Sequence, residues 1–402
     1  MVPDGWEKRD LQGLVAIKHG FAFKSEFFTS NGDLILLTPG SFYESGGFRD
    51  QGEKTKYYYG EVPDGYLLNK GDMLLAMTEQ AEGLLGSALF VPENDRYLHN
   101  QRLGLVQIIQ PNRVCLEFLY LFFNAPFSRK QITEQSTGTK VKHTSPDRLC
   151  SVVGLIPPLP EQKKIAQILS TWDKAITTTE QLLANSQQQK KALMQQLLTG
   201  KKRLLDENGV RFSGEWMHYK FGNVFKERVE VGRVDLPLLS ITADEGVVYQ
   251  EDTGRKNTSN EDKSKYRRIC VDDIGYNTMR MWQGRSSLSD KEGIVSPAYT
   301  IVTPTDNICP TFAAYLFKLP ALIHVFYRHS QGLVSDTWNL KFNHFKKISW
   351  QLPGIEEQRK IAAVLSITDR EITALQQKLD GLKQEKKALM QQLLTGKRRV
   401  TI

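Results

Sequence analysis

The sequence lacks the features that mark secreted, membrane-spanning or metal-binding proteins. Its 402 residues include four cysteines, none in a Cys-x-x-Cys pair, so their spacing indicates neither a zinc site nor a redox motif. No apolar run approaches the roughly 20 residues needed to cross a bilayer. Charged residues interrupt the N-terminal segment where a signal peptide would lie. We therefore expect a cytoplasmic protein with reduced thiols, no membrane contact and no bound metal.

Catalytic motifs are lacking as well. A P-loop needs a glycine five residues before Gly-Lys and a Ser or Thr after it, but Gln195 and Lys202 hold these positions around Gly200 and Lys201. An adenine methyltransferase would carry an Asn/Asp-Pro-Pro-aromatic tetrad, and residues 296–299 (SPAY) lack the amide and the second proline. We expect no catalytic centre and no cofactor in this chain.

What the chain does have is size and positive charge. Its length exceeds the size at which one hydrophobic core stops growing, so two or more domains are expected. The net charge is +8 and the pI is about 9.1. A basic balance of this kind favours a polyanionic partner, nucleic acid first.

The chain contains an internal repeat. Residues 161–203 align without a gap on residues 357–399, an offset of 196, with 26 of 43 pairs identical. Each copy has a carboxylate suited to a first helical turn and a glycine, Gly200 or Gly396, suited to a helix stop, followed by cations near the negative end of the dipole. The repeat predicts two helices of about 40 residues, each about 60 Å long.

An apolar stripe in alternating steps of four and three runs along both copies, with polar breaks such as Lys190 and Lys386. Its members are Ile165, Leu169, Trp172, Ile176, Leu183, Leu193 and Leu197 in the first copy, and Ile361, Leu365, Ile372, Leu375, Leu379, Leu389 and Leu393 in the second. Such a stripe needs a partner helix. The simplest partner is the other copy, running antiparallel as a coiled coil within one chain; the alternative is that the helices dimerise two chains.

Two dissimilar globular modules with one plan precede the two helices. The predicted organisation is a first module over 1–156, a first helix over 157–205, a second module over 206–352 and a second helix over 353–402. Strands are expected at 33–38, 71–77, 103–109 and 298–303, short helices at 116–124 and 311–319, and polar loops at 136–144 and 330–337. The fold class is therefore mixed α/β with a pseudo-twofold internal repeat. Modules so related would face opposite strands of a duplex and, being dissimilar, would recognise different half-sites.

Candidate DNA-binding residues gather in polar segments rich in Arg, Lys, Asn, Gln and aromatic side chains, which suit base edges and phosphates. In the first module they are Arg49, Lys54, Lys56, Tyr57, Arg102, Lys140, Lys142 and His143. In the second they are Arg255, Lys256, Lys265, Arg267, Asn277, Arg280, Trp282, Gln283 and Arg285. Each one, taken singly, has the alternative interpretation of a solvated surface residue.

Several segments resemble the specificity subunits of type I restriction–modification enzymes, and the resemblance spans essentially the whole chain. The segments are 3–6 (PDGW), 20–25 (GFAFKS), 156–166 (IPPLPEQKKIA), 277–284 (NTMRMWQG), 293–299 (GIVSPAY) and the repeated LLTGK ends. In the second copy Gly354 replaces the proline that stands at Pro158 in the first.

The resemblance implies that the modules are target-recognition domains, each recognising one half of a bipartite double-stranded DNA site. It implies that the helices space the modules and dock two methyltransferase subunits and, in a restricting system, two restriction subunits. S-adenosylmethionine, and ATP with magnesium where restriction subunits are present, would bind those partners, which leaves this chain non-catalytic. Two alternatives stay open: a specificity subunit of a methyltransferase-only complex, and a coiled-coil adaptor that binds no DNA.

Overall fold

The computed structural model describes residues 2–79, 82–242, 246–254, 261–333 and 337–402, and it divides into two compact units. Unit 1 comprises Met1–Thr179 and Lys378–Ile402, and unit 2 comprises Glu180–Gln377. Each unit therefore holds one globular module together with a part of each long helix. None of the helices in the described part of the chain is both long and apolar enough to span a membrane.

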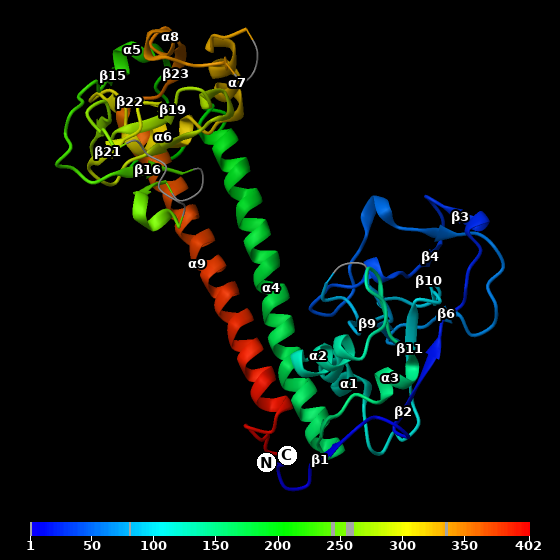
Figure 1. Ribbon diagram of the computed structural model, residues 1–402. Coiled ribbons are helices and arrows are strands. Elements are labelled where there is room, and N and C mark those ends of the chain that lie inside the picture. The colour runs from blue at the N-terminus through cyan, green and yellow to red at the C-terminus, as the bar shows by residue number, and fades with distance from the viewer. Residues whose placement is uncertain (1, 80–81, 243–245, 255–260, 334–336) are drawn as a thin grey trace. The chain divides into compact units, whose positions relative to one another are not determined.

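Both long helices predicted from the repeat are present. They are α4 (Leu159–Leu197, green in Figure 1) and α9 (Ile355–Leu394, orange to red). Each helix stops at a glycine in the left-handed region, with φ of +70° at Gly200 and +67° at Gly396. The amide of Gly200 donates to the Leu197 carbonyl at 3.4 Å, and the amide of Gly396 donates to that of Leu393 at 3.3 Å. Glycine ends both helices because a side chain disfavours this backbone conformation.

Ion pairs join the two helices within unit 1. Glu161 of α4 pairs with Arg399, just beyond α9, and Asp173 pairs with Lys386 at 2.5 Å. Numbers rise along α4 while they fall along α9, so the helices are antiparallel here, as the sequence predicts.

The same pairs recur within unit 2 with the helices exchanged. Glu357 of α9 pairs with Arg203 at 2.5 Å, and Asp369 pairs with Lys190. All four positions follow the 196-residue offset, so each ion pair of unit 1 has its counterpart in unit 2. The helices are therefore antiparallel in both units, and their ion pairs follow the internal repeat.

The apolar stripe lies away from solvent. Eight of its members are buried, namely Ile165, Leu169, Leu183, Leu197, Ile361, Leu365, Leu379 and Leu393, and the other six, Trp172, Ile176, Leu193, Ile372, Leu375 and Leu389, are half-buried. The stripe also reaches beyond the helix pair. In unit 1 Ile165, Leu169 and Leu393 join the core of the module, and in unit 2 Leu197, Ile361 and Leu365 do the same. Fully burying such a side chain stabilises the fold by about 1.5–3 kcal/mol, which ties the helix ends firmly to the modules.

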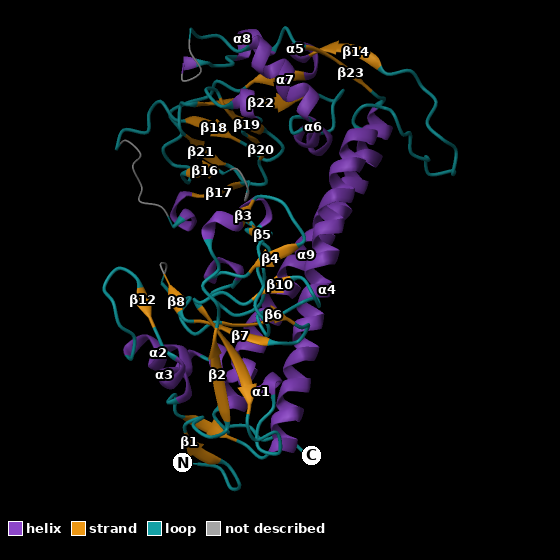
Figure 2. Cartoon of the chain, turned by 90° about the vertical axis from the view of Figure 1, so that its right-hand side faces the viewer, coloured by secondary structure: helices purple, strands orange, loops and turns teal. Residues whose placement is uncertain are grey.

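A four-stranded antiparallel sheet of order β2-β11-β7-β9 forms the centre of the first module. Its strands are β2 (Val15–His19), β7 (Met73–Ala76), β9 (Ala88–Phe90) and β11 (Leu103–Ile108). Side chains of β2 and β7 share one core with helix α1 (Leu116–Asn124), at the residues predicted for it. Helices α2 (Pro126–Glu134) and α3 (Pro146–Cys150) follow (Figure 2).

A second sheet of order β3-β5-β4-β10-β6 belongs to this module alone. Its strands are β3 (Phe28–Thr29), β4 (Leu34–Leu36), β5 (Tyr57–Tyr58), β6 (Leu67–Leu68) and β10 (Tyr97–Leu98). Two ribbons complete the module: β1 (Glu7–Arg9) with β13 (Gly154–Ile156), and β8 (Thr78–Glu79) with β12 (Lys142–His143).

The second module repeats the central plan. Its four-stranded sheet has the order β15-β22-β19-β20, made of β15 (Phe225–Glu227), β19 (Ile274–Asn277), β20 (Ser286–Leu288) and β22 (Tyr299–Pro304). Its ribbon of β14 (Met217–Lys220) with β23 (Ser349–Leu352) matches that of β1 with β13. Helices α6 (Pro310–Leu316), α7 (Pro320–His329) and α8 (Phe342–Phe345) match α1, α2 and α3, and α5 (Phe221–Val224) is added.

Away from this plan the modules differ. In place of a five-stranded sheet, the second module has two ribbons: β16 (Leu239–Ile241) with β17 (Val247–Tyr249), and β18 (Arg267–Ile269) with β21 (Gly293–Val295). The helix expected at 311–319 ends early, at Leu316. Pro320 explains the break, because a proline disfavours helical backbone in the residue before it, and α7 begins at this proline.

Candidate nucleic-acid interface

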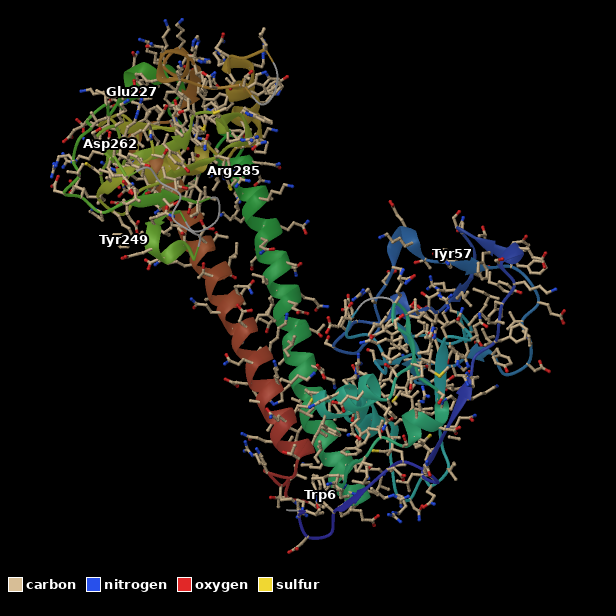
Figure 3. All side chains as sticks on the ribbon, in the orientation of Figure 1. Trp6, Tyr57, Glu227, Tyr249, Asp262 and Arg285 are labelled. Carbon is tan, nitrogen blue, oxygen red and sulfur yellow. The ribbon has the colours of Figure 1, made fainter. Side chains whose placement is uncertain are left out.

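The loop between β19 and β20 carries the densest group of predicted DNA-binding residues. Its base is closed by the amide of Asn277, which donates to the carbonyl of Arg285 at 2.9 Å. Inside it a single turn of 3-10 helix, Met281–Gln283, ends at Gly284, whose φ of +74° suits glycine. Met281 is fully buried and anchors the turn, while the side chain of Arg285 is exposed (Figure 3). The predicted residues Arg280 and Gln283 are exposed on the same loop.

Two other predicted residues of this loop shape it from within. The indole Nε1 of Trp282 donates to the Met279 carbonyl at 3.0 Å, and its ring meets that of Trp338 edge-on at 5.3 Å. The Asn277 side-chain oxygen accepts from the amide of Met279 at 3.0 Å. These contacts fix the loop conformation, so Trp282 and Asn277 position the exposed side chains.

One of the basic residues expected near β18 is ion-paired, and so is its neighbour Arg268. Arg267 pairs with Glu227 at 2.8 Å. Arg268 donates to Glu230 and Glu292, and these hydrogen bonds raise the pKa of its guanidinium. Lys265 is exposed. Arg255 and Lys256 lie outside the described residues.

In the first module, the ribbon of β8 and β12 gathers one predicted group. Lys142 lies opposite Glu79, with its Nζ 3.8 Å from the carboxylate, and His143 lies opposite Thr78, with Nδ1 3.2 Å from the hydroxyl. Glu79 is buried and also accepts from two backbone amides, so this carboxylate holds the base of the ribbon.

Arg102 and Lys140 flank the same ribbon. The carbonyl of Arg102 accepts from the amide of Met77, which directly precedes β8, at 2.9 Å. Lys140 lies two residues before β12. Both side chains are exposed, so the structure brings this predicted group together at one place in unit 1.

The remaining predicted residues of the first module lie beside its second sheet. Arg49 and Tyr57 line a hollow of about 420 Å³. Figure 3 labels Tyr57 on this module. The guanidinium of Arg49 pairs with Glu44 at 2.6 Å, and this bond contributes to the lowered pKa of Glu44, after a backbone hydrogen bond. Lys54 and Lys56 are exposed next to the hollow in sequence. DNA contact stays a prediction for every one of these residues.

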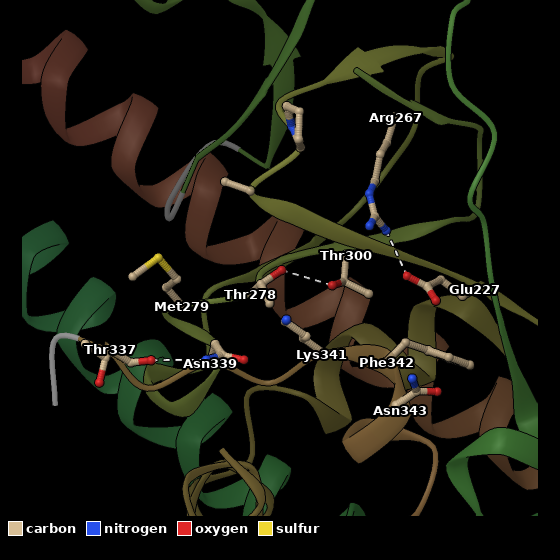
Figure 4. Close-up of a pocket in the computed structure, with 12 residues that line it drawn as sticks. Glu227, Arg267, Thr278, Met279, Thr300, Thr337, Asn339, Lys341, Phe342 and Asn343 are labelled. Atoms are coloured by element: carbon tan, nitrogen blue, oxygen red, sulfur yellow. Dashed lines mark hydrogen bonds and ion pairs between the residues drawn. The ribbon is translucent and has the colours of Figure 1, made fainter. Parts of the chain in front are cut away.

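Unit 2 also contains a pocket whose lining residues the sequence did not predict to lie together. It has a volume of about 570 Å³ and opens beside Thr278 and Met279 of the β19–β20 loop (Figure 4). The segment before β22 and the residues around α8 supply the other walls, including Lys341 and Asn343. The one available signal was the alternation of polar residues at 339, 341 and 343, which by itself does not say what those residues face.

Comparison with known proteins now adds to this geometry. Residues 3–185 match the family model of the type I restriction modification DNA specificity domain. A relative, the type I restriction enzyme EcoBI specificity subunit of Escherichia coli, is 25% identical over 403 residues, covering 90% of this chain and 78% of that protein. The chain is thus defined as one that carries a DNA specificity domain.

Solved structures agree on the fold over the full length. The S subunit of a type I restriction–modification system from M. genitalium matches with a TM-score of 0.59 at 15% identity, covering 98% of this chain and 97% of that one. A chain from a structural study of complex assembly in the type I R-M system matches with a TM-score of 0.56 at 15% identity, covering 99% and 100%. The predicted resemblance and fold class are confirmed: residues 3–185 match the DNA specificity domain of the type I restriction–modification family, and the whole chain has the fold of type I S subunits.

Proposed function

We propose that the protein is the sequence-recognition subunit of a type I restriction–modification system and that each module recognises one half of a bipartite DNA site. The observation that carries this proposal is that each module combines a part common to both modules with a part of its own. The central sheet and the helix junction are built alike in both, whereas the second sheet of unit 1 and the ribbons of unit 2 differ. A common frame with two different surfaces suits two different half-sites.

The placement of exposed cations supports the same proposal. Arg280 and Arg285 stand on a loop that is fixed from within by Trp282 and Met281. Arginine on a rigid loop can donate to guanine in the major groove, and the remaining lysines and arginines suit phosphates. Binding should then weaken steeply as salt rises, since phosphate contacts release counterions.

The proposal assigns the helices to spacing and assembly. They would set the distance between half-sites and dock two methyltransferase subunits, with restriction subunits added in a restricting system. S-adenosylmethionine, ATP and magnesium would bind those partners, and this chain would contribute recognition without catalysis. The protein would work in the cytoplasm, beside the DNA that it recognises.

The experiment that tests the proposal is methylome sequencing of cells with and without this gene, in the presence of its methyltransferase partner. A split adenine-methylation motif that disappears on deletion is expected. An unchanged methylome would contradict the proposal and favour a coiled-coil adaptor that binds no DNA.

Exchange of one module sharpens the test. Residues 206–352 would be replaced by the corresponding module of another family member, with the first module as the internal control. One half of the methylated motif should change while the other half stays. A simultaneous change in both halves would contradict the assignment of one module to one half-site.

A further inference from the structure

The pocket of unit 2 brings together residues that lie 18 or more positions apart in the chain, from two segments that both resemble family segments. Thr278 and Met279 come from the segment at 277–284, and Pro297 and Ala298 come from the segment at 293–299. Their approach follows from β19 and β22, which pair so that Asn277 lies opposite Tyr299. The pocket is therefore a fixed consequence of the central sheet.

The floor of the pocket is polar and neutral. The hydroxyls of Thr278 and Thr300 form a hydrogen bond of 2.9 Å, and Arg267 forms its ion pair with Glu227 in the wall (Figure 4). Because the Glu227 carboxylate cancels the charge of Arg267, this wall offers little attraction to a phosphate.

One side of the mouth is apolar. Met279 is 47% exposed there, and Pro297 and Ala298 continue the surface. A phosphate would leave this apolar surface unused. The edge of a base pair in the major groove presents polar groups and, at thymine, an apolar methyl group, so it matches an apolar side next to a polar floor.

Lys341 and Asn343 line the same pocket and are exposed. They lie two residues apart around the start of α8, which is held by the amide of Phe345 donating to the Lys341 carbonyl at 3.0 Å. A lysine ammonium donates only, and an asparagine amide both donates and accepts. These groups match the acceptor-rich edge of a purine, since lysine suits guanine and asparagine suits adenine.

We propose that this pocket receives the edge of a purine in the half-site of the second module, and that Lys341 and Asn343 are specificity-determining residues. The inference rests on the proposed function and deepens it. It adds a recognition surface from the 339–343 segment to the exposed residues of the β19–β20 loop.

The test is the methylation motif of cells that carry Lys341→Ala or Asn343→Ala in the full chain with its partner. Each variant should relax base preference at one position of one half-site, at least about fivefold, the low end of what a good base contact contributes. The other half-site should stay unchanged. Lys347→Ala is the matched control, because Lys347 is an exposed lysine six residues beyond Lys341 that does not line the pocket, and it should leave the motif intact.

Asn343→Asp gives a readout that misfolding cannot imitate. It exchanges a donor for an acceptor, so the preference at that position should move toward cytosine, whose amino group donates. An unaltered motif in all these variants, or an equal loss of methylation at every site, would overturn the inference and leave the proposed function standing. The absence of any split motif in the wild type would instead overturn the proposed function.

Discussion

The two junctions between helix and module are built from the same residues, and comparing them shows what the repeat preserves. In unit 1 the Gln162 side chain accepts from the amide of Cys115 at 3.2 Å and donates to the carbonyls of Arg113 and Pro157. In unit 2 Gln358 accepts from the amide of Cys309 at 2.9 Å and donates to two carbonyls in the same way. Each glutamine thus ties the start of a long helix to the start of a module helix, α1 in unit 1 and α6 in unit 2.

The ion pairs beside these glutamines match less closely. Glu161 accepts both from Arg399 and from the indole Nε1 of Trp6 at 3.1 Å. Its counterpart Glu357 accepts from Arg203, but the Nε1 of Trp216 is buried without a hydrogen-bond partner in the described chain. The aromatic ring therefore recurs at both junctions, whereas its hydrogen bond does not.

A larger difference lies six residues after Cys115 and Cys309, the residues that directly precede α1 and α6. Leu121 in unit 1 borders a hollow of about 530 Å³ that Ser170 and Asp173 also line. At the matching position Tyr315 donates to Asp369 at 2.6 Å, and its oxygen lies 3.3 Å from that of Ser366. The helix frame is therefore the same at both junctions, whereas the module surfaces that face it differ.

The largest expected effect comes from removing the shared glutamines. Gln162→Ala should destabilise unit 1 by roughly 3 kcal/mol, because each buried backbone group left unpaired costs about 1–3 kcal/mol. Gln358→Ala should destabilise unit 2 by a similar amount. Hydrogen exchange followed by peptide mass spectrometry measures the opening free energy of each unit separately.

Gln167→Ala serves as the control, since Gln167 lies on the same helix and is exposed. It should leave protection in both units unchanged. If Gln162→Ala lowered protection in unit 2 as much as in unit 1, the division into two separately stabilised junctions would be wrong.

The sequence predicts the helix frame but not its contacts. The 196-residue offset and the apolar stripe predict two long helices, because helix periodicity is a local signal, and their antiparallel pairing within one chain is the simpler of two interpretations. Arg203 and Arg399, interpreted as cations at helix ends, instead pair with Glu357 and Glu161 of the other helix. The sequence could have predicted these pairs, because in an antiparallel pair of helices the last residue of one copy faces the first residue of the other.

The candidate site is less accessible to sequence reasoning. Exposed Arg280 and Arg285 follow from a polar loop, and the structure agrees on their exposure. The ring contact of Trp282 with Trp338, and the lining of one pocket by both Met279 and Lys341, bring together segments about 60 residues apart. Such contacts are set by tertiary packing, which a local pattern does not encode.

The next largest effect on stability is expected at Tyr315, whose counterpart in unit 1 is Leu121. Tyr315→Phe should lower the stability of unit 2 by about 1.5 kcal/mol, because it removes a hydrogen bond to a charged group. Burial, and then the hydrogen bond to Asp369, raise the pKa of Tyr315 to about 12 from 10.0. A raised pKa in the folded protein stabilises it below pH 10, and this contribution is lost as the pH rises through about 12.

The stability difference between wild type and Tyr315→Phe should accordingly shrink as the pH rises from 10 toward 12. The converse variant, Leu121→Tyr, places a hydroxyl beside Asp173 and Ser170 and should stabilise unit 1 by up to about 1 kcal/mol. Chemical denaturation across this pH range checks both variants. A constant difference at all pH values would show that the Tyr315 hydroxyl does not act through its protonated form.

The smallest expected effect is the difference in stability cost between substitutions of Trp6 and Trp216. Trp6→Phe removes a buried hydrogen bond to Glu161, whereas Trp216→Phe removes an indole N–H that has no partner in the described chain. Each ring also has an arginine guanidinium nearby, 5.6 Å from the Trp6 ring and 5.9 Å from the Trp216 ring, although Trp6 is buried and Trp216 is half-buried. Trp6→Phe should therefore cost about 1 kcal/mol more than Trp216→Phe, the net value of one hydrogen bond. Hydrogen exchange in the two units measures this difference, and equal costs would mean that the Trp216 indole is as well satisfied as that of Trp6.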